Sequence, residues 1–313
     1  MERPAALFLG GARPYRKHTY SVYVSAMTTT DLLGETHEVD LGDARIRYRD
    51  RGEGPPVVFV HGLLTNGLLW RKVAPAVADA GFRCLTPDWP LGSHELPVPG
   101  ADLSPPGVAA LIARFLEVLG LTDVTVVAND TGGALTQLLM TTSPERIGRV
   151  VLTPSDSFER FLPPMFAPLS TLARIPGGFG PVIQALRSRS LLKATKFVWL
   201  AKHPVPDHIL DAYLLPSRRN PAIREDVVRF AASIDKRYTL TAAERLPLFG
   251  KPVLLVWAPE DRHFPLWLGR KLAGVLPNAE LKTIEDSYAF VPEDQPERLS
   301  GMVVEFLRAH ATT

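Results

Sequence analysis

The residues best placed to do chemistry lie in the stretch Ala128-Asn129-Asp130-Thr131-Gly132, between a β-branched run and a helical pattern. Small residues at both ends of a sharp strand-to-helix turn let the backbone pass close to its neighbours, as in a nucleophile elbow. Asp130 stands at the centre, where a carboxylate could attack carbon and form a covalent ester without prior deprotonation. The simpler alternative is a polar Asn-Asp turn before a helix.

The composition is that of an ordinary globular protein. The chain has 313 residues, of which 46% are hydrophobic and 22% charged, and a net charge of +2. One large domain with an insertion fits these values, as do two domains. No basic block is interleaved with aromatic residues, so we expect no nucleic-acid partner. No apolar run reaches the roughly 18 residues that a membrane span needs.

The single cysteine, Cys84, excludes an intrachain disulfide. This cysteine usage removes the main sign of an oxidising compartment. The apolar run near the N-terminus is short, and its basic residues follow it, which is not the order in a signal peptide. We therefore predict a cytoplasmic location.

Strand and helix patterns alternate along most of the chain. Strands are expected at 38–43, 44–49, 56–60, 84–88, 149–153, 252–257 and 280–284, with a further strand, turn and helix inside 123–139. Helices are expected at 69–80, 104–119, 184–200, 222–234, 266–275 and 295–310. This alternation predicts an α/β fold with a mostly parallel sheet of about eight strands and helices on both faces.

The rhythm changes between residues 155 and 246, which are rich in Pro, Phe, Leu and Arg and show no clear strand. We interpret 155–246 as a helical lid inserted into one sheet. The α/β core would then comprise 36–154 and 247–313. Residues 1–35 are interpreted as an N-terminal extension in which we expect little regular order.

Three further stretches share a pattern with a known family. They are His61-Gly62 with Leu69-Trp70, the segment 257–265 around Asp261, and the segment 286–296. With the elbow, they make residues 36–310 resemble the α/β-hydrolase fold, in particular the haloalkane dehalogenase and epoxide hydrolase branch, whose nucleophile is an aspartate. The resemblance implies Asp130 as nucleophile and Asp261 as the acid that orients a histidine. It also implies the amides of Leu63 and Thr131 as oxyanion donors.

The sequence departs from this family where the catalytic histidine belongs. The family has Gly-His-Phe, and this chain has Tyr288-Ala289-Phe290. Ala289 is either engineered or native, and the additional change at Tyr288 favours a native residue. Without a general base, which contributes about 10²–10⁴-fold, an ester on Asp130 should form and persist.

Two other residues were considered for the incomplete triad. His94 follows the strand 84–88, at the sheet edge where ligands bind in open α/β sheets, so it is a candidate to move a proton. The alternative is a loop histidine that caps its turn. Asp156 is an alternative position for the acid, or a cap of the first lid helix.

The substrate is indicated only as a class. Leu63 and Thr131 replace the polar residue and the tryptophan that hold halide in haloalkane dehalogenases, so we expect negligible dehalogenation. In epoxide hydrolases, lid tyrosines protonate the opening ring, and Tyr213 and Tyr238 are the candidates for this role here. The alternative is that both tyrosines only pack in the lid. The candidate substrate-binding residues are His61, Trp70, Phe158, Phe161, Phe166, Tyr213 and Tyr238. His61 is alternatively a support for the oxyanion turn.

We therefore predict a cofactor-independent enzyme that uses Asp130 to hydrolyse an epoxide, ester or related bond in a small apolar molecule. The alternative is a non-hydrolytic catalyst of elimination, isomerisation or cyclisation, or a ligand-binding protein without hydrolysis. No phosphate-binding glycine motif and no metal-ligand spacing is present, so no cofactor or metal is assigned. The sequence indicates no oligomeric state.

Overall fold

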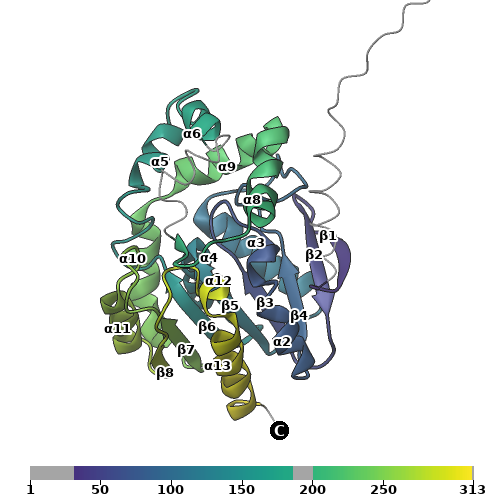
Figure 1. Ribbon diagram of the computed structural model, residues 1–313, viewed down its shortest axis with the longest axis vertical. Coiled ribbons are helices and arrows are strands. Elements are labelled where there is room, and N and C mark those ends of the chain that lie inside the picture. The colour runs from purple at the N-terminus through teal and green to yellow at the C-terminus, as the bar shows by residue number, and fades with distance from the viewer. Residues whose placement is uncertain (1–31, 186–199, 312–313) are drawn as a thin grey trace, which may run out of the picture.

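An eight-stranded, mostly parallel sheet forms the centre of the fold (Figure 1). The computed structural model describes residues 32–185 and 200–311, so most of the predicted extension lies outside the described residues. The strands are β1 (Glu35–Asp40), β2 (Arg45–Arg51), β3 (Pro56–Val60), β4 (Arg83–Pro87), β5 (Val124–Asp130), β6 (Ile147–Ser155), β7 (Val253–Trp257) and β8 (Ala279–Thr283). Their order in the sheet is β1-β2-β4-β3-β5-β6-β7-β8. Strand β2 pairs antiparallel with β1 and β4, and the remaining pairs are parallel, which confirms the predicted fold class.

Helices lie on both sides of this sheet. They are η1 (Gly67–Trp70), α2 (Ala74–Asp79), α3 (Pro105–Val118), α4 (Thr131–Thr142), α5 (Ala167–Ala173), α6 (Gly180–Ala185), α8 (Asp207–Arg219), α9 (Pro221–Ser233), α10 (Lys236–Arg245), η3 (Leu246–Leu248), α11 (Leu266–Val275), α12 (Val291–Asp294) and α13 (Pro296–Ala309). The predicted start of α3 is confirmed, since Ser104 accepts a hydrogen bond from the Gly107 amide. The predicted helix at 69–80 is divided into η1 and α2, because Pro75 favours the first turn of a new helix.

The central strands explain why the sequence shows continuous apolar runs instead of alternation. All residues of β5 and β7 are buried, because parallel strands are covered by helices on both faces. Strand β8 forms one edge of the sheet and carries the more exposed Glu280 and Lys282. The buried core therefore surrounds β5, the strand that ends at Asp130.

The lid helices, which we define as α5, α6, α8 and α9, lie together above one end of the sheet (Figure 1). They follow β6 in the chain and precede β7, as the sequence predicts for an insertion. The last helix of the predicted lid, α10, packs instead against the core helix α4. The predicted segment 155–246 therefore contains both the lid helices and one helix of the core layer.

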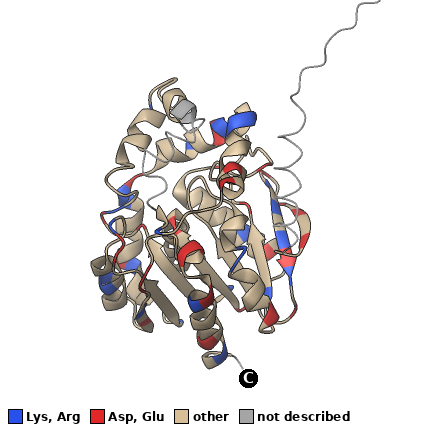
Figure 2. Cartoon of the chain, viewed as in Figure 1, with Lys and Arg blue, Asp and Glu red and all other residues tan. Residues whose placement is uncertain are grey.

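Hydrogen bonds between distant segments hold the lid helices on the core. Ser93 donates to the Tyr213 carbonyl at 2.6 Å, and the Arg229 guanidinium donates to the Val98 and Ala101 carbonyls at 2.7 and 2.9 Å. Lys and Arg are interspersed with Asp and Glu over both parts of the molecule in the view of Figure 2. Of the helices in the described ranges, none combines the length and the apolar character needed to cross a membrane.

A glycine in α4 permits the close approach of that helix to β3, and this generates a prediction. A Cβ atom on Gly132 would lie 2.4 Å from the Val60 carbonyl oxygen and 2.6 Å from that of His61. We expect Gly132→Ala to lower the free energy of unfolding by about 1–3 kcal/mol, because backbone would have to move. The matched control is Gly301→Ala in α13, where a Cβ would meet nothing within 4 Å. Removing a glycine there should raise stability by about 0.5–1 kcal/mol. Thermal unfolding of both variants tests this, and an unchanged midpoint for Gly132→Ala would contradict it.

Candidate active site

The turn between β5 and α4 has the geometry of a strained elbow. Asp130 has φ 56° and ψ −134°, a conformation that non-glycine residues rarely adopt and that costs about 1–3 kcal/mol. Three glycines make room for it. A Cβ on Gly133 would lie 2.2 Å from the Ser155 side chain, and a Cβ on Gly62 would lie 2.7 Å from the Asp130 carboxylate. The tight packing therefore holds the Asp130 side chain against the loop that follows β3.

The two carboxylate oxygens of Asp130 have different surroundings. The Thr131 amide donates to Asp130 Oδ1 at 2.7 Å. No described residue donates to Oδ2. The Leu63 amide follows Gly62 and makes no hydrogen bond within the described part of the chain. One oxygen of Asp130 is thus held by an amide, and a second amide remains available close by, at the predicted oxyanion position.

Three carboxyl groups are buried in this region, on Asp130, Asp156 and Asp261. None of them forms an ion pair with a described Lys or Arg. Burial raises the pKa of Asp130 to about 6 and that of Asp261 to about 7. Burial, followed by the charge of Asp130, raises the pKa of Asp156 well above its usual value. In each case water is removed from the charged form without a cation in compensation.

A threonine hydroxyl connects two of these carboxyl groups. Thr131 Oγ1 lies 3.2 Å from Asp156 Oδ2 and 3.4 Å from Asp130 Oδ1. The other oxygen of Asp156 accepts the Leu162 amide at 2.8 Å. Because a hydroxyl has a single hydrogen, a protonated Asp156 can donate to Thr131 while Thr131 donates to Asp130. Asp156 therefore contacts the elbow, and this contact could not be seen from its place in the sequence.

Asp261 and Ala289 occupy the positions of the predicted acid and the missing histidine. Asp261 Oδ1 accepts the His263 amide at 2.8 Å, whereas Oδ2 is buried and has no partner among the described residues. Ala289 is fully buried, and its carbonyl accepts a hydrogen bond of 2.8 Å from the Asn129 side chain. That bond places Ala289 beside the elbow. The sequence pattern assigns no separate role to Asn129, although this residue directly precedes Asp130 in the elbow.

The structure places the two predicted histidines in supporting positions. His94 Nε2 lies 3.1 Å from Asp226 Oδ2 of α9, and this buried pair joins a core loop to the lid. This contact with Asp226 favours the structural role for His94 over the predicted transfer of a proton. His61 Nε2 accepts the Trp89 amide at 2.9 Å, and burial lowers the pKa of His61 to about 4. Its neutral ring supports the loop that follows β3, the alternative role that the sequence left open.

Both tyrosines considered as proton donors are engaged elsewhere. The Tyr213 hydroxyl is buried and donates to Glu293 at 3.3 Å, beside the Arg71 and Glu293 ion pair. Tyr238 packs on a small cluster formed with α3 and α4, and its hydroxyl accepts a hydrogen bond from Arg237. Neither contact supports a role in protonating a substrate at Asp130.

The other predicted binding residues differ in their surroundings. Phe158 lies under the Lys271 ammonium, 4.0 Å from the ring centroid, and this contact assigns it to the packing of α11. Trp70 is fully buried against Phe59, and its indole nitrogen has no partner within the described part of the chain. Phe161 is buried, and the ring of Phe166 lies 5.7 Å from that of His263. Of these aromatic residues, Phe166 is the one placed beside the Asp261 loop.

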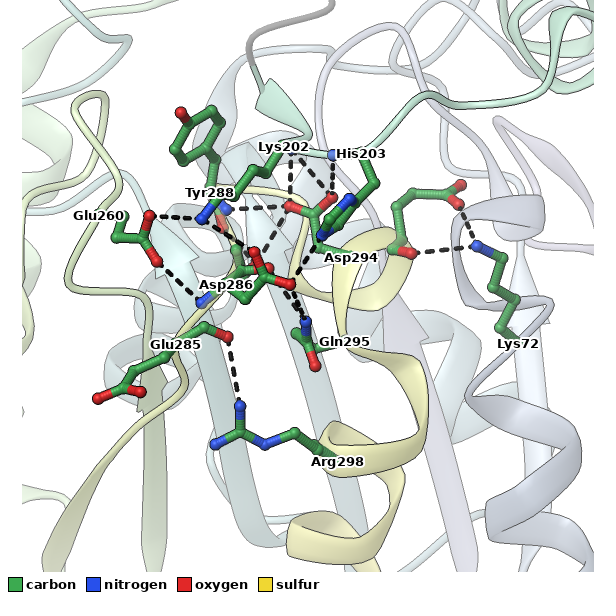
Figure 3. A network of polar contacts seen from close by, with 12 residues as sticks. Lys72, Lys202, His203, Glu260, Glu285, Asp286, Tyr288, Asp294, Gln295 and Arg298 are labelled. Atoms are coloured by element: carbon green, nitrogen blue, oxygen red, sulfur yellow. Dashed lines mark hydrogen bonds and ion pairs between the residues drawn. The ribbon is translucent and has the colours of Figure 1, made fainter.

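A polar network holds the loop that carries Ala289 (Figure 3). Asp294 accepts the Tyr288 amide at 2.9 Å and the Lys202 amide at 2.9 Å. Asp286 pairs with Lys202 and His203. The Tyr288 ring points away from this network in Figure 3 and lines a cavity of about 450 Å³.

The raised pKa of Asp261 generates a prediction for stability. The native state retains this proton up to about pH 7, whereas the unfolded chain loses it near 3.8. The resulting stabilisation is present in full below about pH 4 and is lost as the pH rises through 7. Asparagine does not titrate, so the Asp261→Asn variant does not lose this stabilisation as the pH rises. The free energy of unfolding of the variant minus that of the parent should therefore increase by up to about 4 kcal/mol from pH 4 to pH 7.5. Urea unfolding at both pH values measures the difference, and a pH-independent difference would contradict it.

The chain is similar in sequence and fold to known proteins. The chain is 27% identical over 277 residues to Haloalkane dehalogenase 2 of Mycobacterium tuberculosis (strain ATCC 25618 / H37Rv), covering 87% of this chain and 94% of that protein. It is 30% identical over 278 residues to Non-heme chloroperoxidase CPO-A1 of Kitasatospora aureofaciens, covering 84% of this chain and 95% of that protein. A crystal structure of an alpha/beta hydrolase fold protein from Burkholderia ambifaria shares 26% identity with a TM-score of 0.72, covering 87% of this chain and all of that one. Residues 55–296 match the alpha/beta hydrolase fold family, and the chain is therefore an enzyme of the α/β-hydrolase superfamily.

Proposed function

We propose that this protein hydrolyses an epoxide or ester through a covalent ester on Asp130, with Asp261 acting directly as the base that a histidine usually provides. The observation that carries this proposal is the buried Oδ2 of Asp261, which has no partner among the described residues. The charge of Asp130 acts on this carboxyl group, so the two lie in the same region of the molecule. A general base works best when its pKa lies near the operating pH. The pKa of Asp261, raised by burial to about 7, meets this condition.

The first step uses the free oxygen of Asp130. Its pKa of about 6 leaves the carboxylate ionised at neutral pH, and Oδ2 receives no hydrogen bond from a described residue. Attack of this oxygen on an alkyl carbon of the substrate forms the ester bond and breaks the bond from that carbon to oxygen. An opened epoxide leaves an alkoxide, which takes a proton from water, and a substrate ester leaves as its carboxylate. Leu63 and Thr131 offer no side-chain pair of the kind that holds halide, so we propose an oxygen leaving group and not a halide.

The second step releases the product. Water attacks the ester carbonyl carbon of Asp130, and Asp261 accepts the proton of that water. The intermediate then breaks its bond to the alkoxy oxygen of the product, which leaves as an alcohol with the proton from Asp261. The negative charge that develops on the carbonyl oxygen is stabilised by the Thr131 amide, which already bonds Oδ1, and by the Leu63 amide. The small side chain of Ala289 leaves no imidazole between Asp261 and the ester.

Intact-protein mass spectrometry with panels of epoxides and esters tests the proposal. We expect Asp261→Asn to accumulate an adduct on Asp130, because its hydrolysis should slow by about 10²–10⁴-fold. The parent should turn over and incorporate ¹⁸O from labelled water into Asp130. Asp130→Asn should form no adduct, and the surface control Asp79→Asn should behave as the parent. Turnover by Asp130→Asn at the parental rate would rule out the nucleophile.

Restoring the histidine gives a second prediction. In Ala289→His, with Tyr288→Gly to relieve crowding, an imidazole would stand between Asp261 and the ester, where a triad histidine acts. In this double variant, we expect the Asp130 ester to hydrolyse about 10²–10⁴-fold faster than in Asp261→Asn. Its hydrolysis rate should at least equal that of the parent. Single-turnover decay of the adduct is the measurement. An adduct that persists equally in the double variant and in Asp261→Asn would refute this arrangement.

The contact between Asp156, Thr131 and Asp130 favours a second candidate, a non-hydrolytic catalyst that moves a proton. A protonated Asp156 could resupply Asp130 through the Thr131 hydroxyl, which lies 3.2 and 3.4 Å from the two carboxyl groups. In that case Thr131→Val would abolish exchange of substrate deuterium with water, and no adduct would appear on Asp130. Formation of an adduct with ¹⁸O incorporation distinguishes hydrolysis from this alternative.

A further inference from the structure

A cavity of about 450 Å³ lies beside the loops that carry Asp261 and Ala289. Among the described residues it is lined by Arg160, Pro164, Met165, Arg262, His263 and Tyr288. These residues come from the segments that follow β6, β7 and β8, three parallel strands. Ligands of open α/β sheets bind outside the carboxyl ends of such strands. The cavity is therefore placed where a substrate would approach the proposed base.

Two guanidinium groups give this cavity an unbalanced positive charge. No ion pair joins Arg160 or Arg262 to a carboxylate of the described residues. Arg160 instead donates to the His263 carbonyl at 3.5 Å and lies 5.4 Å from the centre of the Trp267 ring. Both contacts hold the guanidinium in place, and neither neutralises it.

Of the acidic residues adjacent in sequence to these arginines, Glu159 is paired with a lysine, and Asp261 is buried and forms no ion pair with a described residue. Glu159 lies 2.9 Å from Lys271 Nζ. Lys202 Nζ lies 2.6 Å from Glu260 and 2.9 Å from Asp286. Charges of both signs are interspersed over the rest of the view in Figure 2. The positive charge is thus local to the cavity and is not the edge of a basic face.

The remaining lining is apolar, with Pro164, Met165 and the Tyr288 ring. We infer that the cavity binds an organic carboxylate, with its carboxyl group between Arg160 and Arg262 and its apolar body against Met165 and Tyr288. Arginine pairs suit carboxylates because the guanidinium offers two parallel donors. This inference rests on the proposed function in one respect: it makes the substrate an epoxide or ester that also carries a carboxylate.

Binding to the full chain tests the cavity without any chemistry. The probes are 3-phenylpropionate and its uncharged amide, titrated by calorimetry. We expect the carboxylate to bind at least about tenfold more tightly than the amide, an advantage that charge-assisted hydrogen bonds can supply. Arg160→Gln/Arg262→Gln should remove this preference. Equal affinity of the parent for the two probes would overturn the inference.

Matched variants separate a local site from general charge. Arg270→Gln/Arg308→Gln removes the same charge from two exposed positions and should keep the preference. Arg262 is exposed, so Arg262→Gln alone tests the site if the double variant does not fold. A preference that survives in Arg262→Gln, or that disappears equally in the Arg270 and Arg308 control, would contradict a site between the two arginines. Tighter binding of phenylphosphonate than of 3-phenylpropionate would overturn the choice of a carboxylate.

A reactive pair distinguishes failure of the cavity from failure of the proposed chemistry. The epoxides 3-phenylglycidate and 3-phenylglycidamide differ only in the charged group. The rate of Asp130 labelling is followed by mass in Asp261→Asn, where the adduct is expected to persist. Faster labelling by the carboxylate in Asp261→Asn, with equal rates once Arg160→Gln/Arg262→Gln is added, supports both proposals. Equal labelling of Asp261→Asn by the two epoxides retains the nucleophile and overturns the cavity. Selective binding of 3-phenylpropionate without labelling of Asp130 by either epoxide retains the cavity and overturns the chemistry.

Discussion

The close approach of α4 to the strands around it is the constraint on which the site depends. Gly132 lies against the carbonyls of Val60 and His61, and Gly133 lies against the Ser155 side chain. These contacts join β3, β5 and β6 at the point where β5 ends. They also require Asp130 to adopt its strained conformation, because the chain has no room to turn more gradually. The surrounding packing maintains this strain, because β5 is fully buried and the neighbouring strand β3 is buried except at Pro56.

Burial of three carboxyl groups without a cation is the second unusual feature. Elsewhere in the described structure, the buried acids Asp88 and Glu293 pair with Arg49 and Arg71. At the elbow, burial raises the pKa values of Asp130 and Asp261 to about 6 and 7, and no Lys or Arg of the described residues pairs with either group. Burying ionisable carboxyl groups without a cation disfavours folding at neutral pH. Strongly shifted pKa values of this kind concentrate at functional sites. It leaves the proposed base free of a competing ion pair.

The lid helices are held by the polar groups that the site does not use. His94 pairs with Asp226, Tyr213 donates to Glu293, and Ser93 donates to the Tyr213 carbonyl. Each of these contacts is buried and joins residues of a core segment to residues of α8 or α9. The same residue types that could serve catalysis therefore serve attachment here, because a buried polar side chain needs a partner and the nearest one comes from the other part of the fold.

The sequence by itself determined the strands, the elbow and the absence of a histidine at position 289. These features are local: a continuous apolar run predicts a strand covered on both faces, and small residues around Asp130 predict a tight turn. Only the tertiary structure decided the partners of the polar residues. His94 and Asp226 are 132 positions apart, and Tyr213 and Glu293 are 80 positions apart, so no local pattern indicates either pair. For the same reason, only the fold shows the contact between Thr131 and Asp156, which follow different strands. It also decides that one oxygen of Asp261 and the guanidinium groups of Arg160 and Arg262 have no charged partner among residues 32–185 and 200–311.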